Sequence, residues 1–312
     1  MELFKIEYNI STEFDPNSNI IIKEGDCFEE CKKLPNNFFS LIISSPPYNI
    51  GKSYEIKTTL ENYIYNQTIL IKDLYRICKD NGSIVWQIGN FVSNGEIYPL
   101  DIYFYKIFKE LGMKLRNRII WHFNHGLHAS KRLSGRYETL LWFTKTDNYI
   151  FNLDPIRVPS KYPGKRHYKG IKKGLLSGNK LGKNPSDFWD FIKDEFDSGV
   201  IDIPNVKANH PEKTIHPCQF PIELVERFVL ALTNENDVIL DPFGGVGSSL
   251  IAALKQNRKA MIIEKEAKYV KISVDKVNDY FTGKLKTREI GTKIYEPTGK
   301  DKISQYPTEW FK

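Results

Sequence analysis

The sequence predicts an α/β protein in which helices cover both faces of a doubly wound sheet. Apolar runs of strand length recur along the chain, and between them lie segments whose apolar residues follow helical spacing. The clearest unit is an apolar strand at 238–240 that enters a glycine-rich turn, from which a helix at 248–256 leaves. Strands that alternate with helices favour a parallel sheet.

The other elements have local signals of their own. The helix expected at 60–78 places isoleucine and leucine on one face, and the helix at 99–111 ends before Gly112. The helix expected at 221–232 starts at a proline and also has one apolar face. Further strands are expected at 20–23, 39–43, 84–88, 118–121, 139–143 and 260–263.

Composition indicates a globular protein. The chain has 312 residues, 41% of them hydrophobic, which is enough for one large domain with an insertion or for two domains. No apolar run approaches the roughly 18 residues of a membrane helix, and the acidic, mixed N-terminus does not resemble a signal peptide. We therefore expect a soluble, cytoplasmic protein without a membrane segment. The four cysteines form no CxxC pair, so neither a zinc site nor a disulfide framework is expected.

A strongly basic stretch lies in the middle of the chain. Residues 155–185 contain no Asp or Glu and nine basic residues: Arg157, Lys161, Lys165, Arg166, Lys169, Lys172, Lys173, Lys180 and Lys183. A loop that only solubilises a protein normally carries both signs, so this stretch predicts a polyanionic partner such as a phosphate backbone. Glycines and prolines punctuate the surrounding region, 129–203, which predicts an insertion or small subdomain. A merely solubilising loop is the alternative.

The glycine-rich turn is Asp241-Pro242-Phe243-Gly244-Gly245-Val246-Gly247. Its glycines permit a tight turn, and the N-terminus of the following helix offers N–H groups to a ligand. Glu264 ends the next strand, where an acid can accept hydrogen bonds from ribose hydroxyls. An acid at position 241 would repel a pyrophosphate but suits the cationic groups of S-adenosyl-L-methionine. We therefore expect this cofactor rather than a dinucleotide; a turn without a ligand is the alternative.

A second motif, Ser45-Pro46-Pro47-Tyr48, follows the strand expected at 39–43. Two prolines fix two φ angles and remove two donors, which leaves a rigid turn with carbonyl acceptors. With the serine hydroxyl, these acceptors can hold the N–H groups of an exocyclic base amine and aim its lone pair at a methyl sulfonium. The tyrosine can stack on the extruded base. A plain Pro-Pro turn is the alternative.

These motifs resemble those of the DNA amino methyltransferases that modify N4 of cytosine or N6 of adenine. The match is to the β group, in which the catalytic motif precedes the cofactor motif. The resemblance spans about 20–270 and includes Glu24-Gly25-Asp26, Arg136-Tyr137-Glu138 and the segment 216–221. It implies a Rossmann-like methyltransferase sheet that is circularly permuted and has an inserted target-recognition region. Phe220 stands where the family motif usually has Lys.

The resemblance implies three sets of site residues and no metal. The catalytic set is Ser45, Pro46, Pro47 and Tyr48. The set for S-adenosyl-L-methionine is Asp26, Gln219, Asp241, Phe243, Gly244, Gly245, Gly247 and Glu264. The candidate ligands of DNA phosphates are Lys131, Arg132, Lys165 and Arg166.

The resemblance also implies a division of the chain and its partners. The expected parts are a catalytic half at 1–128, a basic target-recognition insert at 129–203, a cofactor half at 204–280 and a tail at 281–312. Double-stranded DNA is the expected partner, and a companion restriction endonuclease and a homodimer are further suggestions. Three classes remain as alternatives: an RNA or protein methyltransferase, which motif order disfavours, a DNA-binding protein without catalysis, and an NAD oxidoreductase.

The prediction of the target base depends on one residue. Serine at the first position of the catalytic motif is more frequent in cytosine-N4 enzymes, so Ser45 favours cytosine N4. Adenine N6 is the alternative, because the same motif followed by Asn49-Ile50-Gly51 also occurs among adenine enzymes.

Two other patterns are decoys. Pro217-Cys218 resembles the nucleophile motif of cytosine-C5 methyltransferases, but here it precedes the glycine-rich turn instead of following it. His122, His125 and His128 are evenly spaced like metal ligands, although their neighbours fit a DNA-facing loop better.

Overall fold

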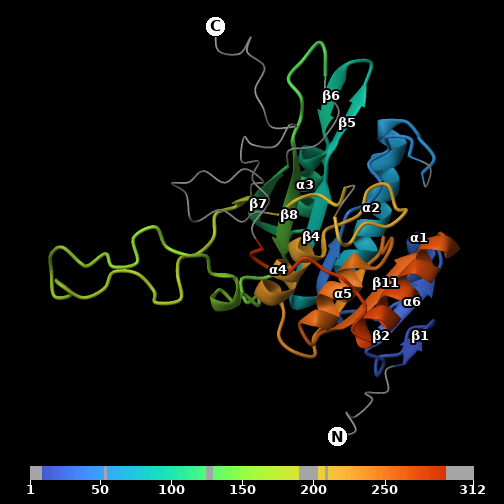
Figure 1. Ribbon diagram of the computed structural model, residues 1–312. Helices are drawn as coiled ribbons and strands as arrows, with labels where there is room; N and C mark the ends of the chain where they lie inside the picture. Colours follow the sequence, from blue (N-terminus) through green and yellow to red (C-terminus); the bar gives the residue numbers. More distant parts are fainter. Residues whose placement is uncertain (1–8, 53–54, 124–128, 190–202, 208–209, 293–312) are drawn as a thin grey trace, which may run out of the picture.

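The protein is built on a nine-stranded sheet with the order β1-β2-β11-β10-β3-β4-β8-β7-β9 (Figure 1). The structure, a computed structural model, describes residues 9–52, 55–123, 129–189, 203–207 and 210–292. His125, His128 and parts of the expected insert and tail, 190–202 and 293–312, lie outside these ranges. The strands of the sheet are β1 (Ile10–Ser11), β2 (Ile20–Glu24), β3 (Phe39–Ser44), β4 (Cys78–Ile88), β7 (Lys114–His122), β8 (Tyr137–Thr144), β9 (Phe188–Trp189), β10 (Val238–Asp241) and β11 (Lys259–Glu264).

The sheet is mixed, because β8 runs antiparallel to both of its neighbours, β4 and β7. The other pairings described within this sheet are parallel. The prediction of a parallel sheet is therefore wrong at β8. The end of β7 pairs with the beginning of β8, His122 opposite Tyr137, so the two strands form a hairpin, and a hairpin reverses the chain direction.

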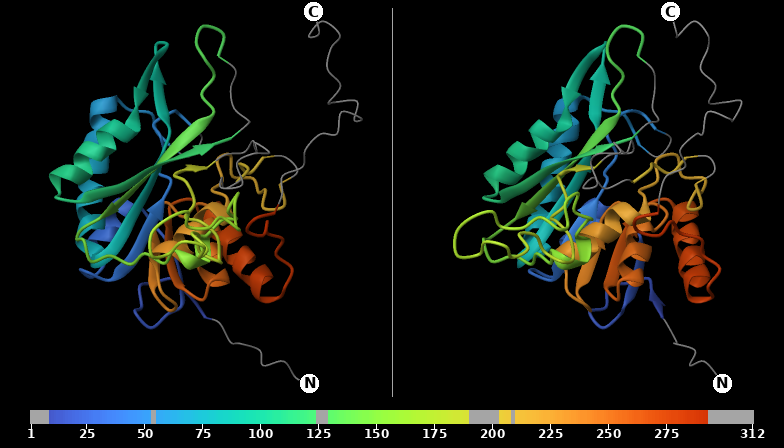
Figure 2. Two further views of the ribbon diagram at one scale, coloured as in Figure 1. Left: turned by 90° about the vertical axis from the view of Figure 1, so that its left-hand side faces the viewer. Right: turned by 60° about the vertical axis from the view of Figure 1, so that its left-hand side comes forward.

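Helices cover both faces of the sheet, as predicted for a doubly wound fold (Figure 2). α1 (Cys27–Lys33), α2 (Leu60–Ile77) and α3 (Leu100–Glu110) pack on one face, and α4 (Ile222–Leu232), α5 (Ser248–Lys255) and α6 (Ala267–Phe281) pack on the other. In the central strand β3, Ile42 contacts the first layer whereas Leu41 and Ile43 contact the second. Burial on both faces explains why this strand is continuously apolar. Every helix in the described part of the chain is too short or too polar to cross a lipid bilayer.

Several elements are absent from the sequence-based expectations, among them the short strands β1 and β9. α1 begins after Asp26, whose side chain accepts a hydrogen bond from Phe28 N and caps the helix. The charged residues exposed on α1 give its sequence the composition of a polar loop. α6 buries Tyr269, Ser273 and Val277 at intervals of one helical turn, so a serine interrupts its apolar stripe. A small separate hairpin of β5 (Asn90–Ser93) and β6 (Glu96–Pro99) was not predicted either.

Residues 155–185, called the basic arm below, project from the molecule as a long yellow-green segment (Figure 1). Two isolated bridges, Val158 with Lys183 and Arg166 with Leu176, hold its two legs together. Ile156 and Val158 are buried, so the arm is anchored at its base. The expected insert, 129–203, also contains β8, but β8 is a strand of the central sheet.

Candidate active site

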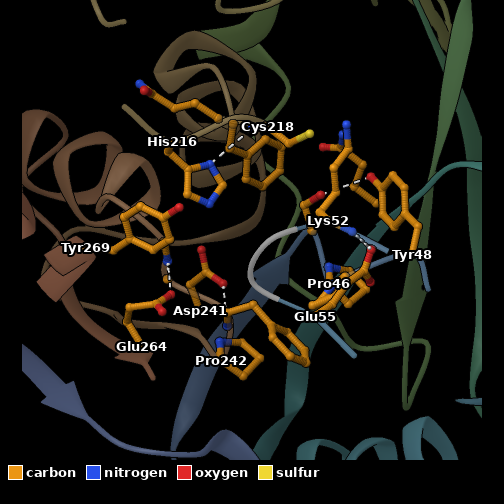
Figure 3. Close-up of a pocket in the computed structure, with 18 of the residues that line it drawn as sticks. Pro46, Tyr48, Lys52, Glu55, His216, Cys218, Asp241, Pro242, Glu264 and Tyr269 are labelled. Carbon is orange, nitrogen blue, oxygen red and sulfur yellow. Dashed lines mark hydrogen bonds between the residues drawn. The ribbon is translucent and has the colours of Figure 1, made fainter. Parts of the chain in front are cut away.

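Two motifs that are far apart in the sequence meet at one edge of the sheet. β3 and β10 are parallel neighbours, with Ile42 opposite Leu240. The Ser-Pro-Pro-Tyr turn follows β3 and the glycine-rich turn follows β10, so both leave the sheet at its carboxyl edge. Ser44 Oγ donates to Asp241 Oδ1 at 2.5 Å and joins the two strand ends. Both turns line a cavity of about 490 Å³ (Figure 3).

The glycine-rich turn requires residues without side chains. A Cβ atom at Gly244 would lie 2.6 Å from Ile262 Cβ, because the turn packs directly against β11. Gly247 has a φ of 74°, which favours glycine, and stands at the N-terminus of α5 without a side-chain cap. Ser248 lines the same cavity, and its buried Oγ has no hydrogen-bond partner among the described residues. The start of α5 therefore presents donors to the cavity.

Glu264 and Asp26 lie at the ends of neighbouring strands on this side of the cavity. β2 and β11 are parallel, with Glu24 opposite Glu264. Glu264 accepts hydrogen bonds from Gly245 N at 2.8 Å and from Glu266 N at 2.7 Å. Burial raises the pKa of its carboxyl group. Glu264 thus holds the glycine-rich turn, while Asp26 caps α1, and both line the cavity.

Asp241 accepts hydrogen bonds from three groups of the protein. Its carboxylate accepts from Ser44 Oγ, from Ser249 Oγ at 2.6 Å and from Phe243 N at 3.0 Å. Burial raises its pKa. Asp241 therefore fixes the shape of the turn, and what it can offer to a cationic ligand is its negative charge and its remaining lone pairs.

Residues 216–220, ahead of α4, form a further wall of the cavity. His216 packs against Tyr269, with ring centroids 4.6 Å apart. Cys218 N donates to His216 Nδ1 at 3.3 Å, and burial lowers the pKa of the imidazole to about 4. The ring is thus neutral at neutral pH, and we assign its proton to Nε2. A Cβ atom at Gly245 would lie 3.6 Å from this Nε2, so the N–H borders the glycine-rich turn.

Gln219 and Phe220 complete this wall. Gln219 Nε2 donates to Glu212 O at 2.7 Å, and its Oε1 accepts from Thr214 Oγ1 at 2.9 Å. The Gln219 amide therefore closes the loop that carries His216. Phe220 packs against the core and lines the cavity, so an apolar ring stands where the related motif usually has a cation.

The two proline carbonyls of the Ser-Pro-Pro-Tyr turn differ in their hydrogen bonds. Tyr63 OH, on α2, donates to Pro47 O at 2.8 Å, and this carbonyl oxygen keeps a second lone pair. Pro46 O accepts no hydrogen bond from the described residues, and Pro46 lines the cavity. Glu55 accepts from Asn49 N at 2.8 Å and holds the chain beyond the turn.

Tyr48 is held by contacts with Gly89, Ser45 and Glu138. A Cβ atom at Gly89 would lie 2.9 Å from the Tyr48 ring, so the backbone after β4 packs against the ring. Tyr48 OH lies 3.0 Å from Ser45 Oγ and donates to Glu138 Oε2 at 3.2 Å. Gln87 Nε2 donates to the same carboxylate oxygen. Burial raises the pKa of Glu138.

Gln87 and Glu138 are cavity residues that the sequence-based site did not include. Gln87 is the next-to-last residue of β4, and Glu138 is the second residue of β8. Because β8 is antiparallel, its beginning lies at the edge where β3 and β4 end. The available signal was the resemblance around Arg136-Tyr137-Glu138, but the direction of β8 was needed to interpret it.

The expected phosphate ligands lie away from the cavity. Lys131 and Arg132 are exposed in the segment before β8, and Lys165 and Arg166 are exposed in the basic arm. The segment before β8 and the basic arm project from different parts of the molecule (Figures 1 and 2). Arg166 Nη1 donates to Gly174 O at 2.6 Å, so Arg166 also braces the arm.

Residues of both decoy patterns lie in the described part of the structure. His122 ends β7 and its ring stacks on Phe188 at 6.3 Å, whereas its two expected companions are not described. Within the described ranges, no group of three His, Cys, Asp or Glu residues is placed to hold a metal ion. Cys218 is exposed and lines the cavity beside the loop of His216.

Comparison with known proteins shows which family has this arrangement. The DNA methylase profile of the N6/N4 methyltransferases matches residues 39–275, most of the chain. The chain belongs to the N6/N4 DNA methylase family. It is 48% identical over 253 residues to the type II methyltransferase M.BglII of Bacillus subtilis, a match that covers 81% of this chain and 67% of M.BglII. This methylase is accordingly a DNA N6/N4 amino methyltransferase.

Solved structures share the fold of this methylase. The cytosine-N4-specific PvuII DNA methyltransferase matches 85% of this chain and 92% of its own, with a TM-score of 0.60 and 21% identity. The M1.HpyAVI–SAM complex matches 82% of this chain and 98% of its own, with a TM-score of 0.53 and 22% identity. At these identities the likeness shows the mixed α/β fold alone.

Family membership decides between the functional classes that the sequence left open. It excludes an NAD oxidoreductase, a DNA-binding protein without catalysis and an RNA or protein methyltransferase. The family contains both cytosine-N4 and adenine-N6 enzymes, so membership does not select the target base.

Proposed function

We propose that this methylase transfers a methyl group from S-adenosyl-L-methionine to an exocyclic amino group of a flipped DNA base, with cytosine N4 as the favoured target. The observation that carries the proposal is that the Ser-Pro-Pro-Tyr turn and the glycine-rich turn line one cavity. Figure 3 places Tyr48 and Pro46 on one side and His216, Tyr269 and Glu264 on the other. When bound, the cofactor supplies an electrophilic methyl group on a sulfonium.

The glycine side of the cavity fits this cofactor. The start of α5, with the unpartnered Ser248 hydroxyl, suits the carboxylate of the methionine part. Glu264 suits the ribose hydroxyls, since it ends the strand that follows the turn. Asp241 supplies negative charge for the cationic groups. Asp26 and Phe243, both lining the cavity, are proposed to border the adenine.

The other side of the cavity suits the target base. Ser45 Oγ and Pro46 O are two acceptors for the two N–H groups of an exocyclic amine. An amine held in this way has its lone pair drawn out of conjugation and directed at the methyl group. Tyr48 offers the ring face opposite Gly89 to the extruded base.

The basic arm supports duplex DNA as the substrate. Lys165, Lys169 and Lys172 are exposed, and no acid lies in the arm to neutralise them. Cations that contact phosphates release counterions, so binding should weaken steeply with added salt. Because β8 belongs to the sheet, we place the start of the target-recognition insert after Thr144 rather than at 129. The catalytic half then ends at Thr144, and the cofactor half remains at 204–280.

Motif order and the relatives extend the proposal to topology and partners. The catalytic turn precedes the glycine-rich turn along the chain, which corresponds to a circularly permuted methyltransferase sheet. M.BglII is a type II methyltransferase, so we propose a companion restriction endonuclease that reads the same DNA sequence. A homodimer is proposed on the resemblance alone.

Ser45 is the residue that favours cytosine N4, because its hydroxyl leaves the turn without a carboxylate or amide at the first position. Adenine N6 is the second candidate, favoured by Asn49-Ile50-Gly51 directly after the motif. Both bases present an exocyclic amine with two N–H groups, and the two free acceptors of the turn suit either.

Labelled methyl transfer tests the proposal. The protein is incubated with unmethylated DNA and S-adenosyl-L-methionine labelled in the methyl group, and the nucleosides are analysed by mass spectrometry. We expect N4-methylcytosine. N6-methyladenine would replace the target base and keep the chemistry. Label found only in 5-methylcytosine, or no label in DNA, would contradict the proposal.

A further inference from the structure

A chain of hydrogen bonds leads away from the site of the target amine. Ser45 Oγ lies 3.0 Å from Tyr48 OH, and Tyr48 OH donates to Glu138 Oε2 at 3.2 Å. The three residues line the same cavity as the glycine-rich turn. An amine that gains a methyl group must lose a proton, so a route for that proton is needed beside the amine.

The direction of this chain follows from its proton count. Each hydroxyl carries a single proton, and the Tyr48 proton is directed to Glu138. The contact between Ser45 and Tyr48 is therefore a hydrogen bond that Ser45 donates. The lone pairs of Ser45 then remain available to an amine N–H. Each hydrogen bond of this chain is thus donated in the direction of the carboxylate.

We propose that Ser45, Tyr48 and Glu138 form a proton relay whose terminal acceptor is Glu138. This inference rests on the proposed function and adds the fate of the proton to it. As the amine nitrogen bonds to the methyl carbon, the carbon–sulfur bond breaks and its electron pair stays on sulfur.

The nitrogen, now positively charged, gives one N–H proton to Ser45 Oγ. Ser45 passes its hydroxyl proton to the Tyr48 oxygen, and Tyr48 passes its own proton to Glu138. The sulfonium charge and the carboxylate charge disappear together, so the total charge of the site is unchanged.

The surroundings of Glu138 suit a proton acceptor. The groups that face it are Tyr48 and Gln87, which donate to its Oε2, and the exposed cation Lys207. Burial raises the pKa of Glu138 and outweighs the opposite effects of these three groups. A base accepts protons most effectively when its pKa lies near the working pH. Burial and the neighbouring Glu138 also raise the pKa of Tyr48, so its hydroxyl hands a proton on instead of remaining ionised.

A purely structural role would have Glu138 only hold the Tyr48 ring. The ring is already held without it, because Gly89 packs against one face and Pro47 precedes it in a rigid turn. Loss of a structural contact would lower the rate equally at every pH. Loss of a proton acceptor would instead remove a dependence of the rate on pH.

Single-turnover methyl transfer at several pH values tests the relay. The wild-type rate should rise as the pH passes the pKa of Glu138, because the carboxylate must be ionised to accept the proton. Glu138→Gln keeps the shape but accepts no proton, and should lower the rate about 10²-fold to 10⁴-fold and abolish the rise. Tyr48→Phe keeps the ring, breaks the chain and should also abolish the rise. Glu138→Asp should recover part of it.

Controls separate the relay from folding and from methyl transfer. Glu110→Gln removes a carboxylate at the exposed end of α3 and should leave rate and pH profile unchanged. Cofactor affinity, measured by calorimetry, should be the same in all variants. Infrared spectra recorded during a pH titration should show a carboxyl group with a raised pKa that disappears in Glu138→Gln.

The outcomes are distinguishable. A wild-type rate in Glu138→Gln, or a lowered rate with the wild-type pH profile, would overturn the relay while methyl transfer itself stands. No methyl transfer to DNA by the wild-type protein would instead overturn the proposed function.

Discussion

The cavity and the basic arm differ in how firmly their side chains are held. Side chains of the cavity are held in place by hydrogen bonds from the protein: Asp241 accepts three and Glu264 accepts two. The basic arm has two isolated bridges and exposed lysines. Methyl transfer needs reacting atoms aligned to within a fraction of an ångström, whereas a phosphate backbone attracts any nearby cation. Chemistry should therefore depend on single side chains, and DNA affinity on summed charge.

The largest expected effect is on turnover when Tyr48 is truncated. Tyr48→Ala removes the stacking face and the hydroxyl together, so we expect kcat to fall about 10³-fold or more. Cofactor affinity should stay within about twofold, because Tyr48 lies across the cavity from Glu264 (Figure 3). Steady-state kinetics and calorimetry measure the two quantities. Equal losses in both would show that the two sides of the cavity do not act separately.

A smaller effect is expected on the glycine side. Gly244→Ala would place a Cβ atom 2.6 Å from Ile262 Cβ, and overpacking of this kind costs about 1–3 kcal/mol. We expect a lower melting temperature and weaker cofactor binding, measured by thermal denaturation and calorimetry. Gly164→Ala in the basic arm is the matched control, since its Cβ atom would meet nothing within 4 Å. A stable Gly244→Ala variant with unchanged cofactor affinity would contradict direct packing of the turn on β11.

The smallest effect per residue is expected in the arm. Combined Lys165→Ala, Lys169→Ala and Lys172→Ala should weaken DNA binding and lower the slope of log affinity against log salt by about one for each lysine that contacts a phosphate. Turnover at saturating DNA should be unchanged. Fluorescence anisotropy at several salt concentrations measures the slope.

The matched control removes the same charge from the helices. Lys72, Lys106 and Lys109 are exposed on α2 and α3, and their combined change to Ala alters the net charge equally. If both triple variants lose the same affinity, the protein's overall charge attracts DNA and the arm has no special part.

The predictions from the sequence were correct for elements whose residue pattern is local. The strand at 39–43 and the helix at 60–78 agree with β3 and α2 to within a residue, because periodic apolar residues report burial directly. Both turns were also found from their own residues. α1 was missed because a short helix with charged exposed residues carries little periodic signal. The hydrogen bond from Tyr63 to the Pro47 carbonyl was not predicted, because Tyr63 lies on a separate element, α2.

The catalytic turn, the glycine-rich turn and the basic stretch could be identified from the sequence alone. Prolines restrict φ, glycines permit tight turns and a one-sign run of charges attracts an opposite polymer, and all of these effects act within a few residues. The alignment of β3 with β10 and the reversed direction of β8 came from packing. That reversal brings Glu138 to Tyr48 across 90 residues, and the distance between them depends on how whole strands pair, which no local pattern records.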